Sequence, residues 1–201
     1  MNKEELLNRF IDLIPRKFKN NTRSLFSVGF IGINGVGKSF VAEKLSEKIG
    51  LYIANNDKIR RFLNESGFND TDYVQKLVFD MGPKLSAHLY ANKLSHIIDA
   101  DIVQFHDITR KNAMDHGARL CIIHLICPEN VILERINKRE KDIAKNPLVN
   151  FSRAGKDEYF KRKALHQSLL LPEVFFTVDT SLDVDIQLNK VVNKLKKEKL
   201  I

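Results

Sequence analysis

The eight residues Gly32-Ile33-Asn34-Gly35-Val36-Gly37-Lys38-Ser39 decide the fold of this chain. They match the pattern G-x-x-x-x-G-K-[ST], in which glycines let the backbone curl so that successive N–H groups face an anion. The lysine places a positive charge near the β- and γ-phosphates of a nucleoside triphosphate, and Ser39 offers a hydroxyl to Mg²⁺. The motif therefore predicts a phosphate-binding loop.

The residues around this loop predict a strand before it and a helix after it. Residues 25–31 form an apolar run, and Val41, Leu45 and Ile49 repeat at helical spacing before Gly50, a typical helix stop. Four more apolar runs follow, at 51–54, 102–105, 120–126 and 174–178. Apolar runs that alternate with helices are typical of a parallel sheet covered on both faces. We expect an α/β fold with three layers and a five-stranded parallel sheet.

The length and composition favour one globular domain over residues 1–201. Apolar residues make up 43% of the chain and charged residues 29%, as in folded proteins. An amphipathic helix is expected over residues 3–18, within an N-terminal segment of 20 residues ahead of the core. We find neither a transmembrane run nor a signal peptide in the sequence, which makes the cytoplasm the expected location.

The net charge of +8 does not choose between partners. It suits a nucleic acid, but it equally suits a protein whose substrates carry phosphates. The sequence has no recognisable platform of interleaved aromatic residues for stacking single-stranded bases. A small-molecule partner is therefore favoured over a nucleic acid.

A second motif, with Asp57 followed by Arg60, comes directly after the second expected strand. Ligands bind at the carboxyl ends of parallel strands, which brings this segment to the phosphate-binding loop. A carboxylate there can accept the proton of an attacking hydroxyl, and the arginine can hold an anionic part of the acceptor. The alternative is that Asp57 caps a helix beginning at Lys58; the two roles are compatible.

The order strand, phosphate loop, helix, strand and Asp-x-x-Arg resembles the P-loop kinases. The resemblance extends to phage polynucleotide kinase, the zeta-toxin-type kinases and the AAA-type ATP-binding kinase-like group, and covers roughly residues 25–198. It implies the three-layer P-loop NTPase fold with a lid, with Asp57 as general base and Arg60 in contact with the acceptor. The loop residues predicted to bind the nucleotide are Asn34, Gly35, Val36, Gly37, Lys38, Ser39 and Phe40, with Ser39 as the metal ligand.

The third expected strand is followed by His106 and Asp107. In the resembled kinases, an aspartate at the end of this strand helps to organise Mg²⁺ or the acceptor, which makes Asp107 a candidate catalytic residue. A loop or helix-capping aspartate is the alternative. His106 is expected to be a packed or loop histidine.

A predicted lid over about residues 135–155 follows the fourth strand. Arg135 and Arg139 lie one helical turn apart and resemble the lid arginines that stabilise the phosphate in transfer. Which of them reaches the phosphates stays open. The alternative is a surface helix with salt bridges to Glu134 and Glu140.

These features together predict an ATP-dependent kinase that uses Mg²⁺ and transfers the γ-phosphoryl group to a hydroxyl of a small molecule. Its catalytic residues would be Lys38, Asp57, Arg60 and Asp107. A nucleic-acid 5′-hydroxyl kinase and a nucleotide-binding switch with little transfer are the alternatives. GTP is disfavoured because the guanine signature Asn-Lys-x-Asp fails at Glu140. The acceptor, expected to contact residues 66–99, and the oligomeric state stay open.

Overall fold

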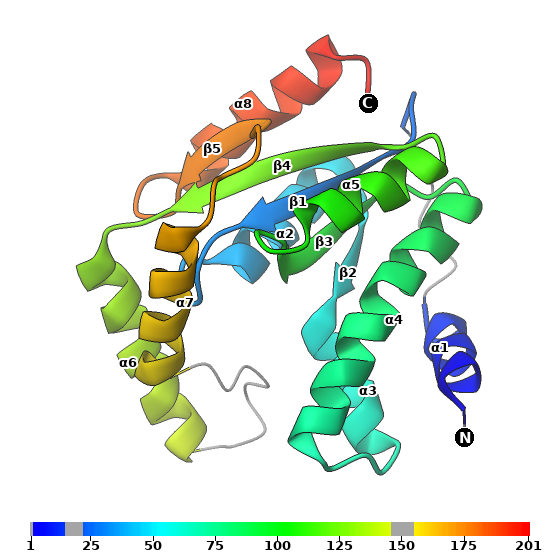
Figure 1. The fold of residues 1–201 in the computed structure, drawn as a ribbon. Coiled ribbons are helices and arrows are strands. Elements are labelled where there is room, and N and C mark those ends of the chain that lie inside the picture. The colour runs from blue at the N-terminus through cyan, green and yellow to red at the C-terminus, as the bar shows by residue number, and fades with distance from the viewer. Residues whose placement is uncertain (1, 15–21, 146–154) are drawn as a thin grey trace.

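The computed structural model describes residues 2–14, 22–145 and 155–201. Helices and strands alternate along most of the chain (Figure 1). The elements are α1 Lys3–Asp12, β1 Phe26–Ile31, α2 Lys38–Ile49, β2 Tyr52–Asn55, α3 Asn56–Glu65, α4 Thr71–Ala91, β3 His96–Asp101, α5 His106–Asp115, β4 Arg119–Ile126, α6 Glu129–Lys145, α7 Lys156–Ser168, β5 Phe176–Asp179 and α8 Val184–Lys197. None of these described helices combines the length and apolar character needed to cross a membrane.

The five strands form one parallel sheet in the order β2-β3-β1-β4-β5. β1 lies in the middle, and all six of its residues are buried. A parallel strand that is covered on both faces needs apolar residues on both, which is why residues 26–31 are apolar apart from Ser27, whose hydroxyl accepts a hydrogen bond from Tyr90. The predicted α/β fold with a five-stranded parallel sheet is confirmed.

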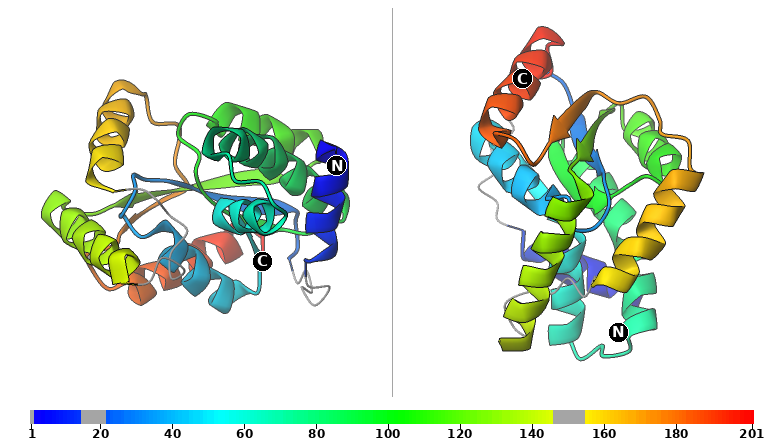
Figure 2. Two further views of the ribbon diagram at one scale, coloured as in Figure 1. Left: turned by 90° about the horizontal axis from the view of Figure 1, so that it is seen from below. Right: turned by 90° about the vertical axis from the view of Figure 1, so that its left-hand side faces the viewer.

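Helices cover both faces of the sheet (Figure 2). On one face, Leu45 of α2 and Leu188 of α8 are buried in the largest apolar cluster, together with Phe26 and Phe30 of β1. On the other face lie α4 and α5, and Ala113 of α5 belongs to a second buried cluster. The three layers follow from these two apolar interfaces.

The N-terminal helix α1 packs against α4. It begins after Asn2, whose side chain accepts a hydrogen bond from Glu5 N at 2.8 Å. Leu6 is buried, and the ring of Phe10 meets that of Phe62 in α3 edge to face at 5.4 Å. The predicted helix over 3–18 is confirmed for Lys3–Asp12, while residues 15–18 lie outside the described part of the chain. α1 therefore supports the pair α3 and α4 from outside.

The third strand lies at 96–101, so the prediction of a strand at 102–105 is wrong. Ile102 and Val103 are buried, but they belong to the apolar cluster that includes Ala113 of α5, in a turn after the strand. Their apolar character therefore reflects packing in a turn and not pairing in the sheet. The strand that does pair with β1 ends in Asp99-Ala100-Asp101, which places two acidic residues at its carboxyl end.

Candidate active site

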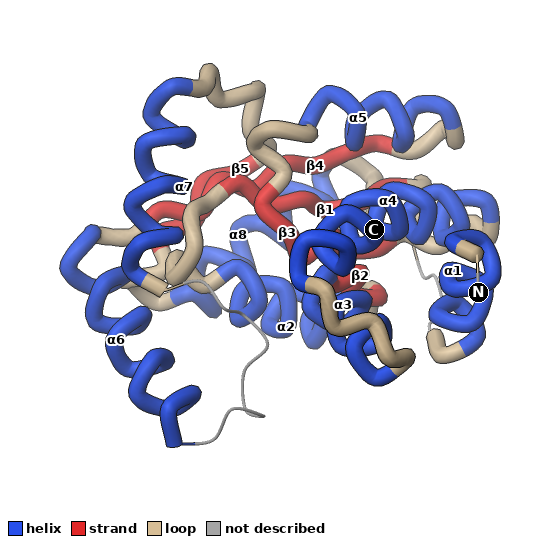
Figure 3. The backbone as a smooth tube through the Cα atoms, turned by 60° about the horizontal axis from the view of Figure 1, so that its bottom comes forward, coloured by secondary structure: helices blue, strands red, loops and turns tan. Residues whose placement is uncertain are grey.

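Two pairs of helices extend beyond the carboxyl edge of the sheet (Figure 3). We call α3 and α4 the acceptor arm, and α6 and α7 the lid arm. A cavity of about 940 Å³ is lined by residues of both arms, of the loop between β1 and α2, and of the end of β3. The strand ends therefore form the floor of a site with two opposite walls.

The phosphate loop has a backbone that requires glycine at two positions. Gly35 and Gly37 have φ angles of 85° and 102°, in the left-handed region that other residues rarely adopt. Gly37 is also the N-cap of α2, and no side chain caps the helix there. The first amides of α2 are thus directed at the cavity in the way that anion-binding helix N-termini require.

Lys38 folds back over this loop. Its Nζ donates hydrogen bonds to Gly32 O at 2.7 Å and Ile33 O at 3.1 Å. Burial lowers the pKa of Lys38, while the carboxylates of Asp101 and Asp99 act in the opposite direction. The ammonium group is therefore held in the loop, close to the two acidic residues of β3.

Asp99 connects the loop to the second strand. It accepts hydrogen bonds from the hydroxyl of Ser39 and from the side-chain amide of Asn55. Its side chain is buried, and this burial raises the pKa of the carboxyl group although Ser39, Lys38 and Asn55 act against the rise. Ser39 and Asp99 together present the oxygen donors that Mg²⁺ prefers.

Asp101 connects the loop to the lid arm. Its carboxylate accepts hydrogen bonds from His166 of α7 at 2.7 Å and from Gly32 N at 3.4 Å. Burial alone would raise the pKa of Asp101, but the bond from His166 and the charge of Lys38 outweigh it and lower the pKa. The carboxylate form is thus stabilised at the point where α7 approaches the start of the loop.

The second predicted motif lies on the acceptor arm. Arg60 forms an ion pair with Asp57 through Nη1, and its Nη2 donates to Gln75 Oε1 at 2.8 Å. The alternative role of Asp57 as the helix cap is wrong, because α3 begins at Asn56 and its cap is Asn55, which accepts from Asp57 N at 2.7 Å. The carboxylate of Asp57 is therefore not used as a helix cap; it lines the cavity and pairs with Arg60.

The two predicted lid arginines have different surroundings. Arg135 donates to Thr180 O at 2.7 Å, to Thr180 Oγ1 at 3.0 Å and to Val36 O at 3.3 Å. Burial lowers the pKa of Arg139, and the carboxylates of Glu140 and Asp57 oppose this effect. Arg135 thus ties the lid arm to the phosphate loop, whereas Arg139 lies within electrostatic reach of the acceptor arm.

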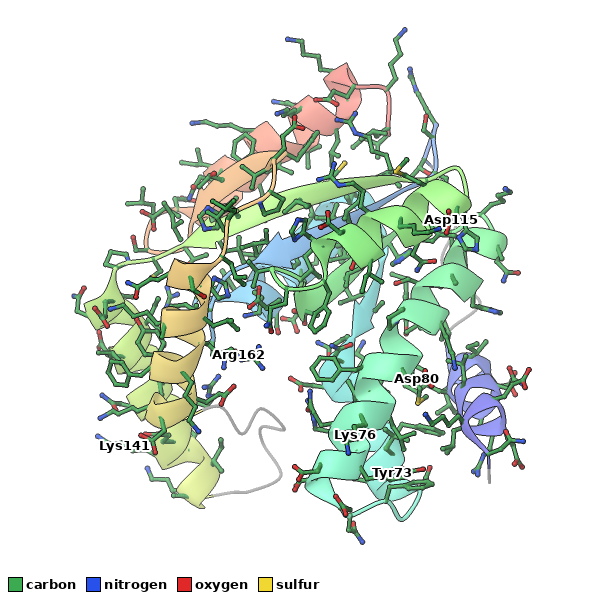
Figure 4. The ribbon with its side chains drawn as sticks, in the orientation of Figure 1. Tyr73, Lys76, Asp80, Asp115, Lys141 and Arg162 are labelled. Atoms are coloured by element: carbon green, nitrogen blue, oxygen red, sulfur yellow. The ribbon has the colours of Figure 1, made fainter. Side chains whose placement is uncertain are left out.

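A third lid-arm arginine that lines the cavity, Arg162, comes from α7 and was missed by the sequence interpretation. Its Nε donates to Glu158 Oε1 at 2.8 Å, one helical turn away. Figure 4 shows Arg162 on the side of α7 that is directed toward the acceptor arm. Since the predicted lid ended near residue 155, this helix fell outside it, and residues 146–154 of that prediction lie outside the described part of the structure.

Most of the predicted residues meet in the cavity. Those that line it are Asn34, Gly35, Gly37, Lys38, Ser39, Phe40, Asp57, Arg60, Arg135 and Arg139. Val36 contributes its carbonyl oxygen to Thr180 and Arg135, while its side chain is buried in the core. The missed residues Asp99, Asp101 and Arg162 also line the cavity, and the apolar run Ile97-Ile98 before an Asp-x-Asp pair was the signal that could have located the first two.

Asp107 does not reach this site. It lies in the first turn of α5 with a side chain that is 88% exposed, and its partner is His106 at 3.3 Å. His106 is the first residue of α5 rather than a loop residue, and its ring contacts Val103 O at 2.9 Å, which fits the expected packed histidine. The prediction for Asp107 is wrong because the third strand was expected too late in the chain. β3 ends at Asp101, six residues before Asp107, and its end places Asp99 and Asp101 at the cavity.

The protein supplies few metal ligands by itself. Among the residues that the structure describes, no three His, Cys, Asp or Glu side chains are grouped to hold an ion. Mg²⁺ commonly binds through one or two protein oxygens and completes its octahedron with phosphate oxygens and water. The donor pair Ser39 and Asp99 fits this arrangement.

Comparisons with known proteins agree with the geometry. The family model of the AAA domain matches residues 28–153. No curated protein matches the chain in sequence. Among solved structures, a suspected kinase from Chloroflexus aurantiacus superposes with a TM-score of 0.67 at 18% identity, covering 89% of this chain and 100% of that one.

Two other similar structures have related folds. The APS kinase of Mycobacterium tuberculosis, in complex with AMPPNP and APS, gives a TM-score of 0.59 at 18% identity and covers 86% of this chain and 98% of that one. A chain of the PezAT toxin–antitoxin system of Streptococcus pneumoniae gives 0.61 at 15% identity, with 97% and 94% covered. The chain belongs to the AAA domain family and has the fold of the P-loop kinases.

Proposed function

We propose that this protein is an ATP-dependent kinase that transfers the γ-phosphoryl group to a hydroxyl group of a small molecule. The observation that carries the proposal is one cavity that brings together two chemically different sets of groups, the phosphate loop and the Asp57–Arg60 pair of the acceptor arm. Its volume of about 940 Å³ is near the upper end of the roughly 300–1,000 Å³ typical of small-molecule sites. That volume suits two substrates bound together.

The phosphate side of the cavity is built to hold a triphosphate. Lys38 would exchange its loop carbonyls for the β- and γ-phosphate oxygens, and the first amides of α2 would surround the same phosphates. Ser39 and Asp99 would hold Mg²⁺, which neutralises charge on the phosphates during transfer. In this proposal the nucleotide and its metal ion are bound by the loop, Lys38, Ser39 and Asp99, which already contact one another.

The acceptor hydroxyl would lie beside Asp57. A carboxylate in this position accepts the proton of the attacking hydroxyl as the new bond to phosphorus forms. Arg139 and Arg162 come from the lid arm and would stabilise the negative charge on the phosphoryl group in transfer. Asp101 and His166 would position the loop relative to α7.

Labelled ATP tests the proposal directly. The protein, with Mg²⁺ and ATP carrying a labelled γ-phosphate, is incubated with sugars, amino sugars, nucleosides and 5′-hydroxyl oligonucleotides. Lys38→Ala should abolish the labelled product while far-UV circular dichroism shows an intact fold. Lys84→Ala is the matched control, because Lys84 is exposed and pairs with Asp80 on the outside of α4. ATP binding without transfer to any acceptor would favour a nucleotide switch instead.

A further inference from the structure

The polar residues of the acceptor arm that face the cavity are mostly uncharged. They are the amides Asn56, Asn64 and Gln75 with the hydroxyl of Thr71, joined by the amide of Asn69 in the loop between α3 and α4. Because Gln75 Oε1 accepts from Arg60, its amide nitrogen remains as a donor. Amide and hydroxyl groups can each donate to or accept from a hydroxyl, so this wall matches a substrate that carries several hydroxyl groups.

The charges on this arm compensate one another. Arg60 pairs with Asp57 and donates its second Nη to Gln75, which leaves no uncompensated positive charge in the pair. Lys76 follows Gln75 in the chain, but it is exposed and does not line the cavity. The other cations among the described lining residues, Lys38, Arg135, Arg139 and Arg162, come from the loop and the lid arm. The groups that can bind an anion thus belong to the phosphate loop and the lid arm, where the triphosphate is proposed to bind.

Two aromatic rings line the cavity beside these amides. Phe79 of α4 and Phe105, just before α5, are 43% and 39% exposed, and both line the cavity. Their ring centroids are 5.5 Å apart with a tilt of 46°, so they present one continuous apolar surface. The C–H face of a sugar or cyclitol ring, or the face of a nucleobase, packs well on such rings.

We infer that the acceptor is an uncharged ring compound with several hydroxyl groups, of the sugar, cyclitol or nucleoside class. Its hydroxyls would bond to the amides, and its ring would lie against Phe79 and Phe105. A carboxylate, sulfate or phosphate in the same place would lose its hydration without gaining an unpaired cation. The inference rests on the proposed function, since it names the substrate of the same cavity.

Matched pairs of compounds test the inference. Glucose is compared with glucuronate, and a nucleoside with its 5′-monophosphate, as acceptors of labelled γ-phosphate from ATP. We expect the neutral member of a pair to have a kcat/KM at least about tenfold higher. Comparing the kcat/KM values of the sugar and the nucleoside shows which class of neutral acceptor the site prefers. A tenfold preference for the anionic members would overturn the inference.

Two variants locate the preference on this wall. Phe79→Ala should raise the KM of the neutral acceptor by about 2- to 12-fold, which corresponds to the loss of an aromatic contact. Phe160→Ala is its control, because Phe160 is exposed on α7 and does not line the cavity. Asn64→Lys supplies the missing cation and should shift the preference about tenfold toward the anionic members. Asn130→Lys adds the same charge outside the cavity and should leave the preference unchanged.

A binding measurement separates failure of the inference from failure of the proposed function. Saturation-transfer NMR with AMPPNP and Mg²⁺ present detects contact between the compounds and the protein without any chemistry. If no compound is phosphorylated, yet the neutral members bind and Phe79→Ala removes that binding, the inference stands and the kinase proposal fails. Binding of the anionic members alone, or of none, would overturn the inference.

Discussion

Replacing Arg135 with methionine separates a structural arginine from a catalytic one on the lid arm. The wild-type guanidinium donates to both oxygens of Thr180 and to Val36 O. Methionine keeps the apolar stem but removes every donor. Thr180 is buried, so its carbonyl loses a 2.7 Å bond in a place with little water.

The magnitude follows from these contacts. An unsatisfied buried acceptor costs about 1–3 kcal/mol. Val36 O still accepts a hydrogen bond from Thr180 Oγ1 at 2.5 Å, so losing the bond from Arg135 to Val36 O adds little to this cost. We therefore expect Arg135→Met to lower the free energy of unfolding by about 1.5–3 kcal/mol, with most of the functional change in the KM for ATP.

Arg162→Met is the matched control. Arg162 is half-buried and pairs with Glu158 one helical turn away, a partly exposed ion pair that contributes about 0.3–0.5 kcal/mol. Its removal should barely change stability but should lower kcat by about 100-fold or more, because it would stabilise the transferring phosphoryl group. Urea unfolding is followed by far-UV circular dichroism, since the chain has no tryptophan. A stable Arg135→Met variant with a 100-fold loss of kcat would refute this assignment.

Three further predictions concern pH, the loop and the metal. Burial lowers the pKa of His96 from 6.5 to about 4. Between these pH values the unfolded chain binds a proton that the folded protein excludes. The free energy of unfolding is therefore highest above pH 6.5 and decreases as the pH falls toward 4. Relative to His96→Gln, the wild type should lose about 2 kcal/mol between about pH 7.5 and about pH 5 in urea titrations, and a constant difference would contradict this. Gly35→Ala would place Cβ 2.9 Å from Ile132 and 3.0 Å from Ile136 at a φ of +85°, and should cost about 1–3 kcal/mol by thermal unfolding; an unchanged Tm would be inconsistent with that strain. Asp99→Asn should raise the Mg²⁺ concentration for half-maximal transfer by about 10- to 100-fold, whereas an unchanged requirement would move the metal elsewhere.

The phosphate loop and its flanking elements could be predicted because their signals are local. The glycines, Lys38 and Ser39 are contiguous, and the strand before them and the helix after them have clear apolar patterns. The same holds for Asp57 and Arg60, which directly follow β2 and form a pair within one helical turn. Chain connectivity alone brings these residues together at the edge of the sheet.

The rest of the site depends on partners that are distant in the chain. Asp99 and Asp101 interrupt the apolar pattern of β3, and they are tolerated there because Asn55 and His166 supply hydrogen bonds from 44 and 65 positions away. Sequence alone does not reveal such partners, so the mostly apolar residues 102–105, which carry no charge, looked like the better strand. Arg162 was missed for a related reason, since only the folded lid arm brings α7 over the cavity.

Single-turnover transfer of labelled γ-phosphate, compared between Asp57→Asn and Asp107→Asn, tests the central claim most directly. Asp57 faces the cavity, whereas Asp107 is exposed on α5 outside it. We expect Asp57→Asn to lower the transfer rate by about 10²- to 10⁴-fold and Asp107→Asn to leave it unchanged. A rate within a few-fold of wild type in Asp57→Asn, or a large loss in Asp107→Asn, would contradict the account.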